Sequence, residues 1–511
     1  MAPLAGWVKD ARSAPDPRVG FRFLGLRQER RGIGGALGFH PSGVAGLGMT
    51  VQTRLPFELD QRAEAGVVTA YGGVPLLIEA FRVSGAAGVL DERVAIKRRQ
   101  RGLRPSELVE GLFALWAAGG ERCEDLDPLR EDGALALLLG HGIPAPQTAR
   151  DFLEAFDEAA PPLWQGATCH VPGEGERLQG LSAASRRLVG FLQERRPRAT
   201  ATLDLDATIL ESHKRSAQAT YDGRRGYQPV IALWAEQDVI LADEFRDGNV
   251  PAGTGNRRLV EAALAALPAG VARIVVRGDS ALYEHDLLRW LDAGGIGYAI
   301  SADMSRELAA ALRALPESAW LLEREDGDAL RHWAEVAYVP SDGVASKDRP
   351  APPRYLALRI SKKQGRLFAD GGEVKHFAIV TNLADPDGGS GLDLIRWHRA
   401  KAGTVEHAHH VLTNELAAEA LPSQKFAANA AWFRLNVLLY NLLSAFKRVA
   451  LPVELHSARP KRLRFVLLNG IGKVVRHARE TVLRLVGETR RQLADAARLA
   501  LATGPPLGAT A

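Results

Sequence analysis

The sequence predicts an α/β protein with a mixed β sheet flanked by helices, a β-rich insertion, and helical regions at both ends. Three observations carry this prediction. Apolar residues recur at helical spacing over 65–199, strand-like and helix-like segments alternate over 200–305, and strand-like pieces follow over 306–392. With 511 residues the chain is too long for a single core, so we expect roughly three or four domains.

The N-terminal part predicts short helices. We expect residues 1–64 to be disordered, because most of this segment is rich in Gly, Pro and Arg and lacks periodicity. Residues 104–116 place apolar side chains on one helix face, and residues 144–156 open a further helix with polar residues in its first turn. This pattern is typical of a helix-turn-helix that reads DNA. A small helical bundle has the same pattern, so both interpretations stay open.

The segments after residue 200 predict the central sheet. They follow the order β-β-β-α-β-α-β, at residues 201–207, 227–235, 239–245, 257–267, 273–276, 284–291 and 297–301. Three antiparallel strands followed by alternating helix and strand is the order of the ribonuclease-H-like fold. In that fold the first and fourth strands lie side by side, so we expect the residues at their ends to meet.

Acidic residues stand at these strand ends. Asp206 ends the first strand, Asp279 follows the fourth, and Glu406 lies on a later helical segment. Carboxylates at one point repel one another unless a divalent cation relieves the repulsion. Glu415, on the same helical segment as Glu406, is a second candidate for the third acid. Asp204, two residues before Asp206, is assigned a structural role.

The ligand types predict the metal. Hard carboxylate oxygens suit Mg²⁺ or Mn²⁺, and two such ions in one active site can catalyse phosphodiester transfer. We expect Asp206 to bridge both ions, with Asp279 a ligand of one and Glu406 a ligand of the other. The nearby histidines His407 and His409, with His410, have no obvious partner ligands, so we expect them to face the surface or DNA.

Basic residues are distributed unevenly, although the net charge is only +5. Residues 447–491 contain twelve Lys and Arg against three Glu, and residues 97–104 contain no acid. Separated basic patches predict a polyanionic partner such as double-stranded DNA, while solvated faces are the alternative. The expected DNA contacts are Lys97, Arg98, Arg99, Arg101, Arg277, Lys401, Arg459, Lys461, Arg462 and Arg464.

Other features limit the cellular context. The two cysteines, Cys123 and Cys169, have no CxxC companion, which disfavours a zinc module or disulfide framework and fits a reducing cytoplasm. Residues 1–20 lack the apolar region of a secretory signal. Residues 427–443 are apolar but interrupted by polar side chains, so they predict a buried helix and no membrane partner.

Several motifs resemble those of DDE insertion-sequence transposases, specifically the thirteen-eighty insertion-sequence family, relatives of piggyBac. They are Leu203–Thr208, Gly226–Pro229, Arg277–Ser280, Gly403–His407 and Asn429–Asn436, with Gly102–Pro105 and Ala117–Glu121 extending the resemblance, so that it covers about residues 65–490. Such transposases surround the Glu with a Tyr, an Arg and a Lys. Those positions hold Arg399, Ala402 and Thr413 here, while His398 and Lys401 lie one place away.

The resemblance implies a function and a domain plan. It implies a ribonuclease-H-like core, metal-dependent cut-and-paste transfer, and a homodimer holding the inverted-repeat ends of a bacterial element. Water would cleave the element's end, and the freed 3′-hydroxyl would attack target DNA. The expected parts are a disordered segment (1–64), a helical DNA-binding or dimerisation domain (65–199), the first part of the core (200–305), the β-rich insertion (306–392), helices completing the core with the catalytic Glu (393–450), and a basic C-terminal region with a disordered tail (451–511).

We therefore expect a cytoplasmic, nucleoid-associated transposase. Two alternatives remain from the sequence. One is a nuclease of the same fold that hydrolyses DNA without strand transfer. The other is a domesticated DNA-binding protein that has lost catalysis.

Overall fold

The computed structural model describes residues 67–96, 102–340, 352–362, 374–386, 389–477 and 480–503. All of them belong to one compact unit, residues 63–511. The segments expected to be disordered, 1–64 and the tail beyond 503, lie outside the described residues, as does the basic cluster Lys97, Arg98, Arg99 and Arg101.

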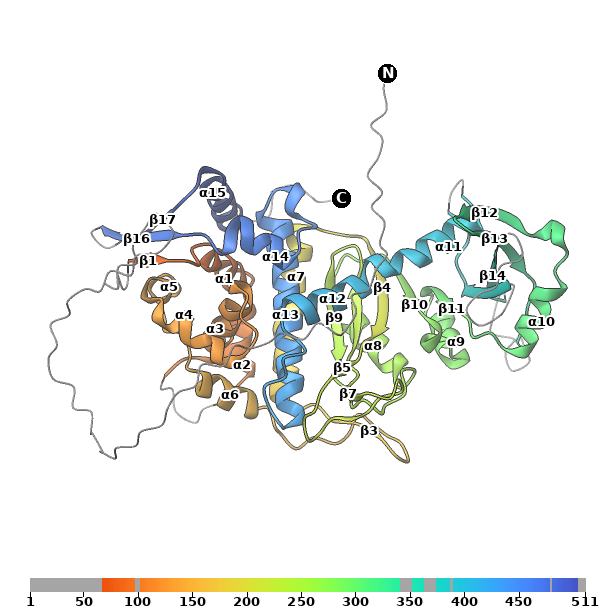
Figure 1. Ribbon diagram of the computed structural model, residues 1–511, viewed down its shortest axis with the longest axis horizontal. Helices are drawn as coiled ribbons and strands as arrows, with labels where there is room; N and C mark the ends of the chain where they lie inside the picture. The colour runs from red at the N-terminus through yellow and green to blue at the C-terminus, as the bar shows by residue number, and fades with distance from the viewer. Residues whose placement is uncertain are drawn as a thin grey trace, which may run out of the picture. The chain divides into compact units, whose positions relative to one another are not determined.

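A mixed sheet forms the centre of the described part (Figure 1). Its nine strands have the order β12-β13-β14-β15-β11-β10-β4-β8-β9. The core strands are β4 (Thr200–Ala207), β8 (Val230–Trp234), β9 (Val239–Glu244), β10 (Arg273–Gly278) and β11 (Gly297–Ser301). β4, β8 and β9 pair antiparallel, whereas β10 pairs parallel with both β4 and β11. The predicted neighbouring of the first and fourth strands is therefore confirmed.

The strands expected in the insertion extend this same sheet. They are β12 (Leu321–Asp326), β13 (Ala329–Val336), β14 (Arg354–Lys362) and β15 (Val374–Thr381), and β15 pairs antiparallel with β11. A small apolar cluster including Leu356, Ile379 and Ile395 fixes α11 (Gly391–Arg399) against them. The sequence predicted these strands, but not that they continue the central sheet.

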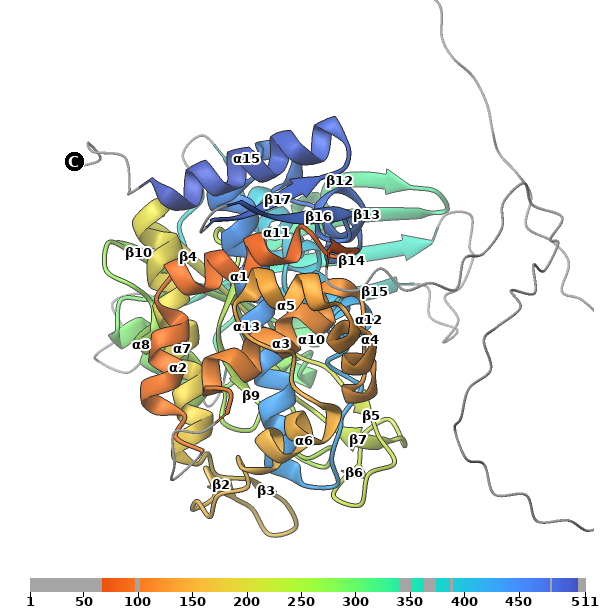
Figure 2. The same cartoon turned by 90° about the vertical axis from the view of Figure 1, so that its left-hand side faces the viewer.

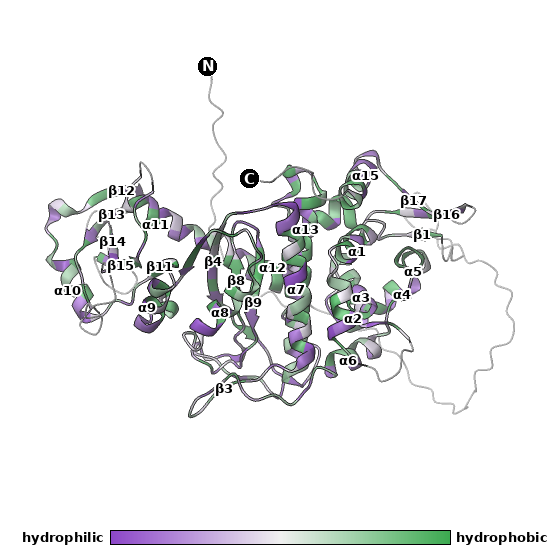
Figure 3. Cartoon of the chain, turned by 180° about the vertical axis from the view of Figure 1, so that it is seen from behind, coloured by the Kyte–Doolittle hydropathy of each residue, from purple (hydrophilic) through white to green (hydrophobic). Residues whose placement is uncertain are grey.

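Helices cover both faces of the sheet, as the views from the front and behind show (Figures 1 and 3). α8 (Asn256–Ala266) packs on β8 and β9, and α9 (His285–Ala293) packs on β11. α12 (Val405–Glu415) packs on β4 and β8. α7 (Glu176–Arg195) and α13 (Phe426–Ala450) contact β9 and separate the sheet from the N-terminal helices.

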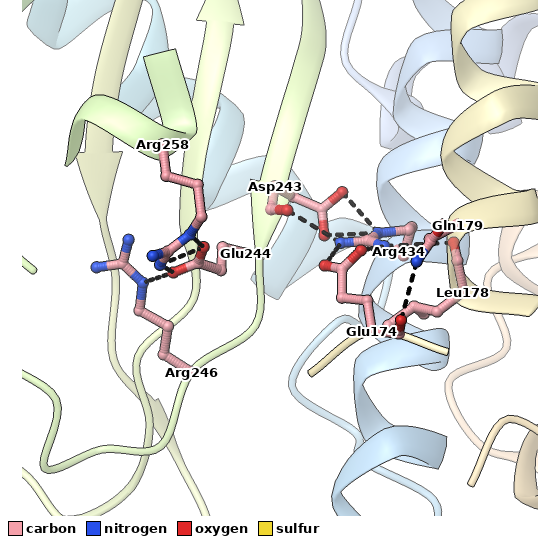
Figure 4. Close-up of polar contacts among 8 residues, drawn as sticks. All are labelled: Glu174, Leu178, Gln179, Asp243, Glu244, Arg246, Arg258 and Arg434. Carbon is pink, nitrogen blue, oxygen red and sulfur yellow. Dashed lines mark hydrogen bonds and ion pairs between the residues drawn. The ribbon is translucent and has the colours of Figure 1, made fainter. Parts of the chain in front are cut away.

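α13 is buried along almost its whole length, as predicted for residues 427–443. Two of its polar residues, Arg434 and Asn441, have partners on β9. The Arg434 guanidinium lies 3.0 Å from Asp243 and 2.7 Å from Glu174 (Figure 4). The Asn441 amide donates to the Ile240 carbonyl at 2.7 Å. Polar groups on a buried helix therefore lock it to β9. No helix of the described part is long and apolar enough to span a bilayer.

Beside this ion pair, a second buried pairing stabilises the edge of the sheet. Glu244 accepts from Arg246 at 2.5 Å and from Arg258 of α8 at 2.8 Å (Figure 4). The two networks occupy neighbouring residues of β9, one on each face of the strand. Through these contacts, β9 is linked to α8 on one face and to α13 on the other.

The N- and C-terminal parts pack together (Figure 2). The N-terminal helices are α1 (Val74–Val83), α2 (Ala86–Arg93), α3 (Pro105–Ala118), α4 (Leu126–Glu131), α5 (Gly133–Leu139) and α6 (Pro146–Glu154). The C-terminal elements are α14 (Pro460–Leu463), a π-helix (Arg464–Leu468), β16 (Gly472–His477), β17 (Glu480–Leu485) and α15 (Glu488–Ala502). β1 (Val68–Thr69) pairs with β16. The predicted N-terminal helices are confirmed, while a DNA-reading role for them stays a prediction. The C-terminal region was expected to be helical, but it also contains the antiparallel strands β16 and β17.

Candidate active site

Asp206 and Asp279 lie side by side at one edge of the sheet. In the parallel pairing of β4 and β10, Leu205 is the partner of Gly278. Asp206 and Asp279 directly follow these two residues, so both emerge where the strands end. The Asp279 carboxylate also accepts a hydrogen bond from the Ala281 amide at 3.0 Å, which fixes the turn after β10.

Glu406 approaches from α12, in the helix's first turn. Val405, Ala408 and Leu412 are buried and hold this helix against the sheet. Glu406 itself is exposed, because it lies on the opposite face of the turn from Ala408 and Leu412. The three acids thus come from two adjacent strands and one covering helix.

The electrostatics of Asp206 report the proximity of the other two acids. The pKa of Asp206 is raised to about 6, chiefly by burial; the Lys401 ammonium opposes the rise, and the carboxylates of Asp279 and Glu406 contribute to it. The side chain of Asp206 is only 17 % exposed. The site therefore concentrates negative charge that water screens poorly.

Lys401, expected to contact DNA, points into this site instead. It is 8 % exposed, and its Nζ lies 3.5 Å from Asp206 Oδ1. A lysine held this way partly offsets the charge of Asp206 and does not present its ammonium to a phosphate backbone. The sequence shows that Lys401 lies close to Glu406 along the chain, but not which way its side chain turns.

Arg277, also expected to contact DNA, is buried in the core. Its guanidinium makes two hydrogen bonds to Asp204, at 2.5 and 2.7 Å, and stacks over the Trp397 ring, 4.7 Å from the centroid. The Thr404 hydroxyl donates to the same Asp204 carboxylate. The expectation of a DNA contact does not fit this position. The structural role assigned to Asp204 does fit, because Asp204 joins β4, β10 and the start of α12.

Two histidines hold the strand ends that carry the acids. His409 Nε2 donates to the Asp206 carbonyl at 3.3 Å, and His398 Nε2 donates to the Gly278 carbonyl at 3.0 Å. Burial lowers the pKa of each to about 4, so both are neutral at pH 7. His409 was expected at the surface. Its spacing of three residues from Glu406, on one face of a helix, is the signal that could have placed it here.

Glu415, the competing third acid, lies at the other end of α12. Its carboxylate pairs with Arg459 at 2.9 Å and accepts from the Lys461 amide at 2.8 Å. Glu415 therefore belongs to the contacts of the basic C-terminal segment, and Glu406 is the residue of this helix that faces Asp206.

The basic residues Arg459, Lys461, Arg462 and Arg464 line one hollow of about 890 Å³. Lys461 and Arg462 are exposed and make no ion pair within the described residues. Arg464 differs, because its guanidinium donates to the carbonyls of Trp116 and Glu415, each at 2.6 Å. Arg464 therefore caps the ends of α3 and α12, which does not fit the expected phosphate contact. Its pKa is lowered by burial.

The acids suit a divalent cation in ligand type. Asp206, Asp279 and Glu406 supply hard oxygens, and the raised pKa of Asp206 marks charge that a cation would neutralise. Among the described residues, the structure contains no group of three or more His, Cys, Asp or Glu side chains that are close enough together to hold a metal ion. The three carboxylates fit a metal in ligand type, but in this structure they are not close enough together to bind the same ion.

Comparisons with known proteins give a family match for the chain. Residues 57–499 match the family model described as "Transposase DDE domain group 1". None of the curated proteins matches the chain. One similar solved structure is described as "Cryo-EM structure of piggyBac transposase synaptic complex with hairpin DNA (SNHP)", with 11 % sequence identity, a TM-score of 0.41, and coverage of 85 % of this chain and 83 % of that chain. The family match spans the sheet, the three acids and the basic segment.

Proposed function

The chain belongs to the transposase DDE family, domain group 1, and we propose that Asp206, Asp279 and Glu406 are its catalytic metal ligands. The match confirms the family inferred from the sequence motifs. As a member of this family the chain is an enzyme of metal-dependent DNA cleavage and transfer. The narrower assignment to the thirteen-eighty insertion-sequence family stays a prediction.

One observation carries the proposal for the site. Two carboxylates emerge side by side from parallel strands, and a third from α12 lies close enough to raise the pKa of Asp206. The order β9-β8-β4-β10-β11 supports interpreting the core as ribonuclease-H-like, because it places the first and fourth strands, β4 and β10, side by side, as expected for that fold.

The chain's own residues supply orientation and charge. His409 and His398 hold the backbone at the ends of β4 and β10, so the spacing of Asp206 and Asp279 depends on these two neutral donors. Lys401 offsets the charge of Asp206 and must yield this partner when Asp206 binds a cation. Two Mg²⁺ or Mn²⁺ ions held here would strengthen the attacking oxygen and stabilise the leaving oxygen of a phosphodiester.

The substrate follows from the family and the charge distribution. We propose that the enzyme binds the inverted-repeat ends of a bacterial insertion sequence and moves the element by cut-and-paste transfer. Lys461 and Arg462 are exposed without ion pairs in the described part, and we assign them to phosphates. We further propose a homodimer that joins two ends, acting in the cytoplasm on nucleoid DNA.

The test asks whether Asp279 and Glu406 are needed for cleavage and whether Glu406 or Glu415 is the third acid. Asp279→Asn and Glu406→Gln should abolish cleavage and joining of a labelled element end in Mg²⁺, while end binding in Ca²⁺ stays nearly unchanged. Glu415→Gln, on the same helix as Glu406, serves as the matched control and should retain cleavage. Active Glu406→Gln beside inactive Glu415→Gln would reassign the third acid. Cleavage without joining by the wild type would indicate a nuclease.

A further inference from the structure

An aromatic side chain stands exposed in the basic hollow of the C-terminal region. Phe465 is 75 % exposed, although phenylalanine is usually buried. It lines the hollow together with Arg459, Lys461, Arg462 and Arg490. An aromatic face exposed among cations is suited to a partner with a flat apolar surface and negative charge.

The backbone holds Phe465 in this position. Residues Arg464–Leu468 form a π-helix, closed by a hydrogen bond from the Asn469 amide to the Arg464 carbonyl at 3.0 Å. Single π-helical turns of this kind occur frequently at functional sites. Arg464 is anchored inward on α3, and Leu467 and Leu468 are fully buried. Because its neighbours on both sides are fixed in the core, Phe465 cannot turn inward without breaking those anchors.

Arg459 pairs with Glu415, whereas three other cations of the hollow, Lys461, Arg462 and Arg490, have no ion pair with a carboxylate among the described residues. The Arg462 guanidinium lies 5.8 Å from the centre of the Phe465 ring and has no ion pair in the part of the chain that the structure covers. Within the described residues, the Arg490 guanidinium donates to the carbonyls of Val486 at 3.2 Å and Phe465 at 3.1 Å and pairs with no carboxylate. The Lys461 ammonium is likewise without a carboxylate partner in that part of the chain. This is a positive surface with one aromatic face at its centre.

We propose that Phe465 stacks on an unpaired base of DNA, while Lys461, Arg462 and Arg490 contact the flanking phosphates. The inference rests on the proposed function, since it takes DNA as the ligand. In an intact duplex the faces of the bases are covered by their neighbours, so an aromatic ring can stack only on a base that has left the helix. Cations beside an aromatic platform are the combination by which proteins bind single-stranded DNA.

The experiment compares single-stranded with duplex DNA. Binding of a labelled thymidine homopolymer, and of a fully paired element end, is measured by fluorescence anisotropy in Ca²⁺. Phe465→Ala and Phe465→Leu should each weaken binding of the homopolymer about 5- to 150-fold, the range of one lost base stack. Both should leave duplex affinity within about twofold, and Phe465→Trp should restore homopolymer binding. Tyr221→Ala, which removes another strongly exposed aromatic outside the hollow, should change neither affinity.

The outcomes distinguish this inference from the proposed function. If the wild type binds the paired end but not the homopolymer, the stacking inference is overturned and the proposed function stands. If Phe465→Ala weakens both DNAs equally, or neither, the ring does not recognise bases and the inference is also overturned. If the wild type binds neither DNA, both proposals fail. Phe465→Leu guards against a folding artefact, because it keeps an apolar side chain of similar size while removing the aromatic face.

Discussion

Replacing Arg277 with methionine tests whether this residue stabilises the core or contacts DNA. The side chains of Asp204 and Arg277 are 0 % and 3 % exposed, and two hydrogen bonds join them. Methionine fills a similar volume but leaves the Asp204 carboxylate with the Thr404 hydroxyl as its remaining side-chain partner. The variant therefore keeps most of the volume but removes the positive charge together with its hydrogen bonds to Asp204 and to the Trp397 carbonyl.

The expected cost is large. Removing one partner of a buried ion pair destabilises a protein by about 3–5 kcal/mol, because the other charge stays buried without compensation. Arg277→Met should lower the free energy of unfolding by this amount, measured by urea unfolding. In the double variant Asp204→Leu/Arg277→Met no charge is left unpaired, so much of the loss should be recovered. Arg257→Met breaks an ion pair between side chains that are 56 % and 48 % exposed, and should cost at most about 1 kcal/mol.

The salt dependence of DNA binding tests the alternative, that Arg277 contacts a phosphate. A side chain that contacts one phosphate contributes about 0.9 to the slope of log K against log salt concentration. We expect Arg277→Met to leave this slope unchanged at temperatures where the variant is folded. An unchanged free energy of unfolding together with a slope reduced by about 0.9 would refute the structural role of Arg277 and return it to the DNA interface.

The remaining predictions concern Asp206 and the basic segment. The pKa of Asp206 is raised from 3.8 to about 6, so the folded protein binds this proton more tightly than the unfolded chain. Protonation of Asp206 therefore stabilises the fold as the pH falls through about 6, and above that pH the ionised carboxylate lowers the free energy of unfolding. Asp206→Asn should therefore be more stable than wild type at pH 7.5 in EDTA, by up to about 3 kcal/mol. The difference should shrink toward pH 4 in urea unfolding, and Ca²⁺ should stabilise only the wild type; a less stable Asp206→Asn at pH 7.5 would contradict this. Lys461→Ala/Arg462→Ala should make the salt slope of DNA binding shallower by up to about 2 without lowering stability. Arg464→Ala should instead lower stability, because carbonyls at the ends of α3 and α12 lose their donor; a stable Arg464→Ala with a shallower slope would return Arg464 to the phosphate contacts.

The core strands were predictable because their signals are local. Apolar runs with turn residues between them mark β4, β8 and β9. The alternation of strand and helix that follows predicted that β4 and β10 are adjacent in the sheet. The extension of the sheet was not predictable in this way. The pairing of β15 with β11 joins residues about eighty positions apart, and no local pattern distinguishes it from a separate β domain.

The positions of Asp206 and Asp279 at the ends of adjacent strands were also predictable, whereas the orientations of the basic side chains were not. The side chain of an aspartate is short, so the carboxylate of an aspartate at a strand end lies close to that end. A lysine or arginine has a long side chain that can turn either to solvent or to an internal acid. For Arg277 a signal did exist, because Arg277 and Asp204 interrupt two apolar strands at the same register position. Opposite charges paired across adjacent buried strands predict an internal ion pair.

The buried polar groups below the acids couple catalysis to folding. Asp204 holds β10 through Arg277 and the start of α12 through Thr404, and Thr404 stands two residues before Glu406. The distance between Glu406 and the two strand-end acids is thus determined by a carboxylate with no access to solvent. Such a network is costly to break and has few alternative arrangements. The geometry of the three acids should therefore be lost together with the core packing around Asp204, and not by independent motion of α12.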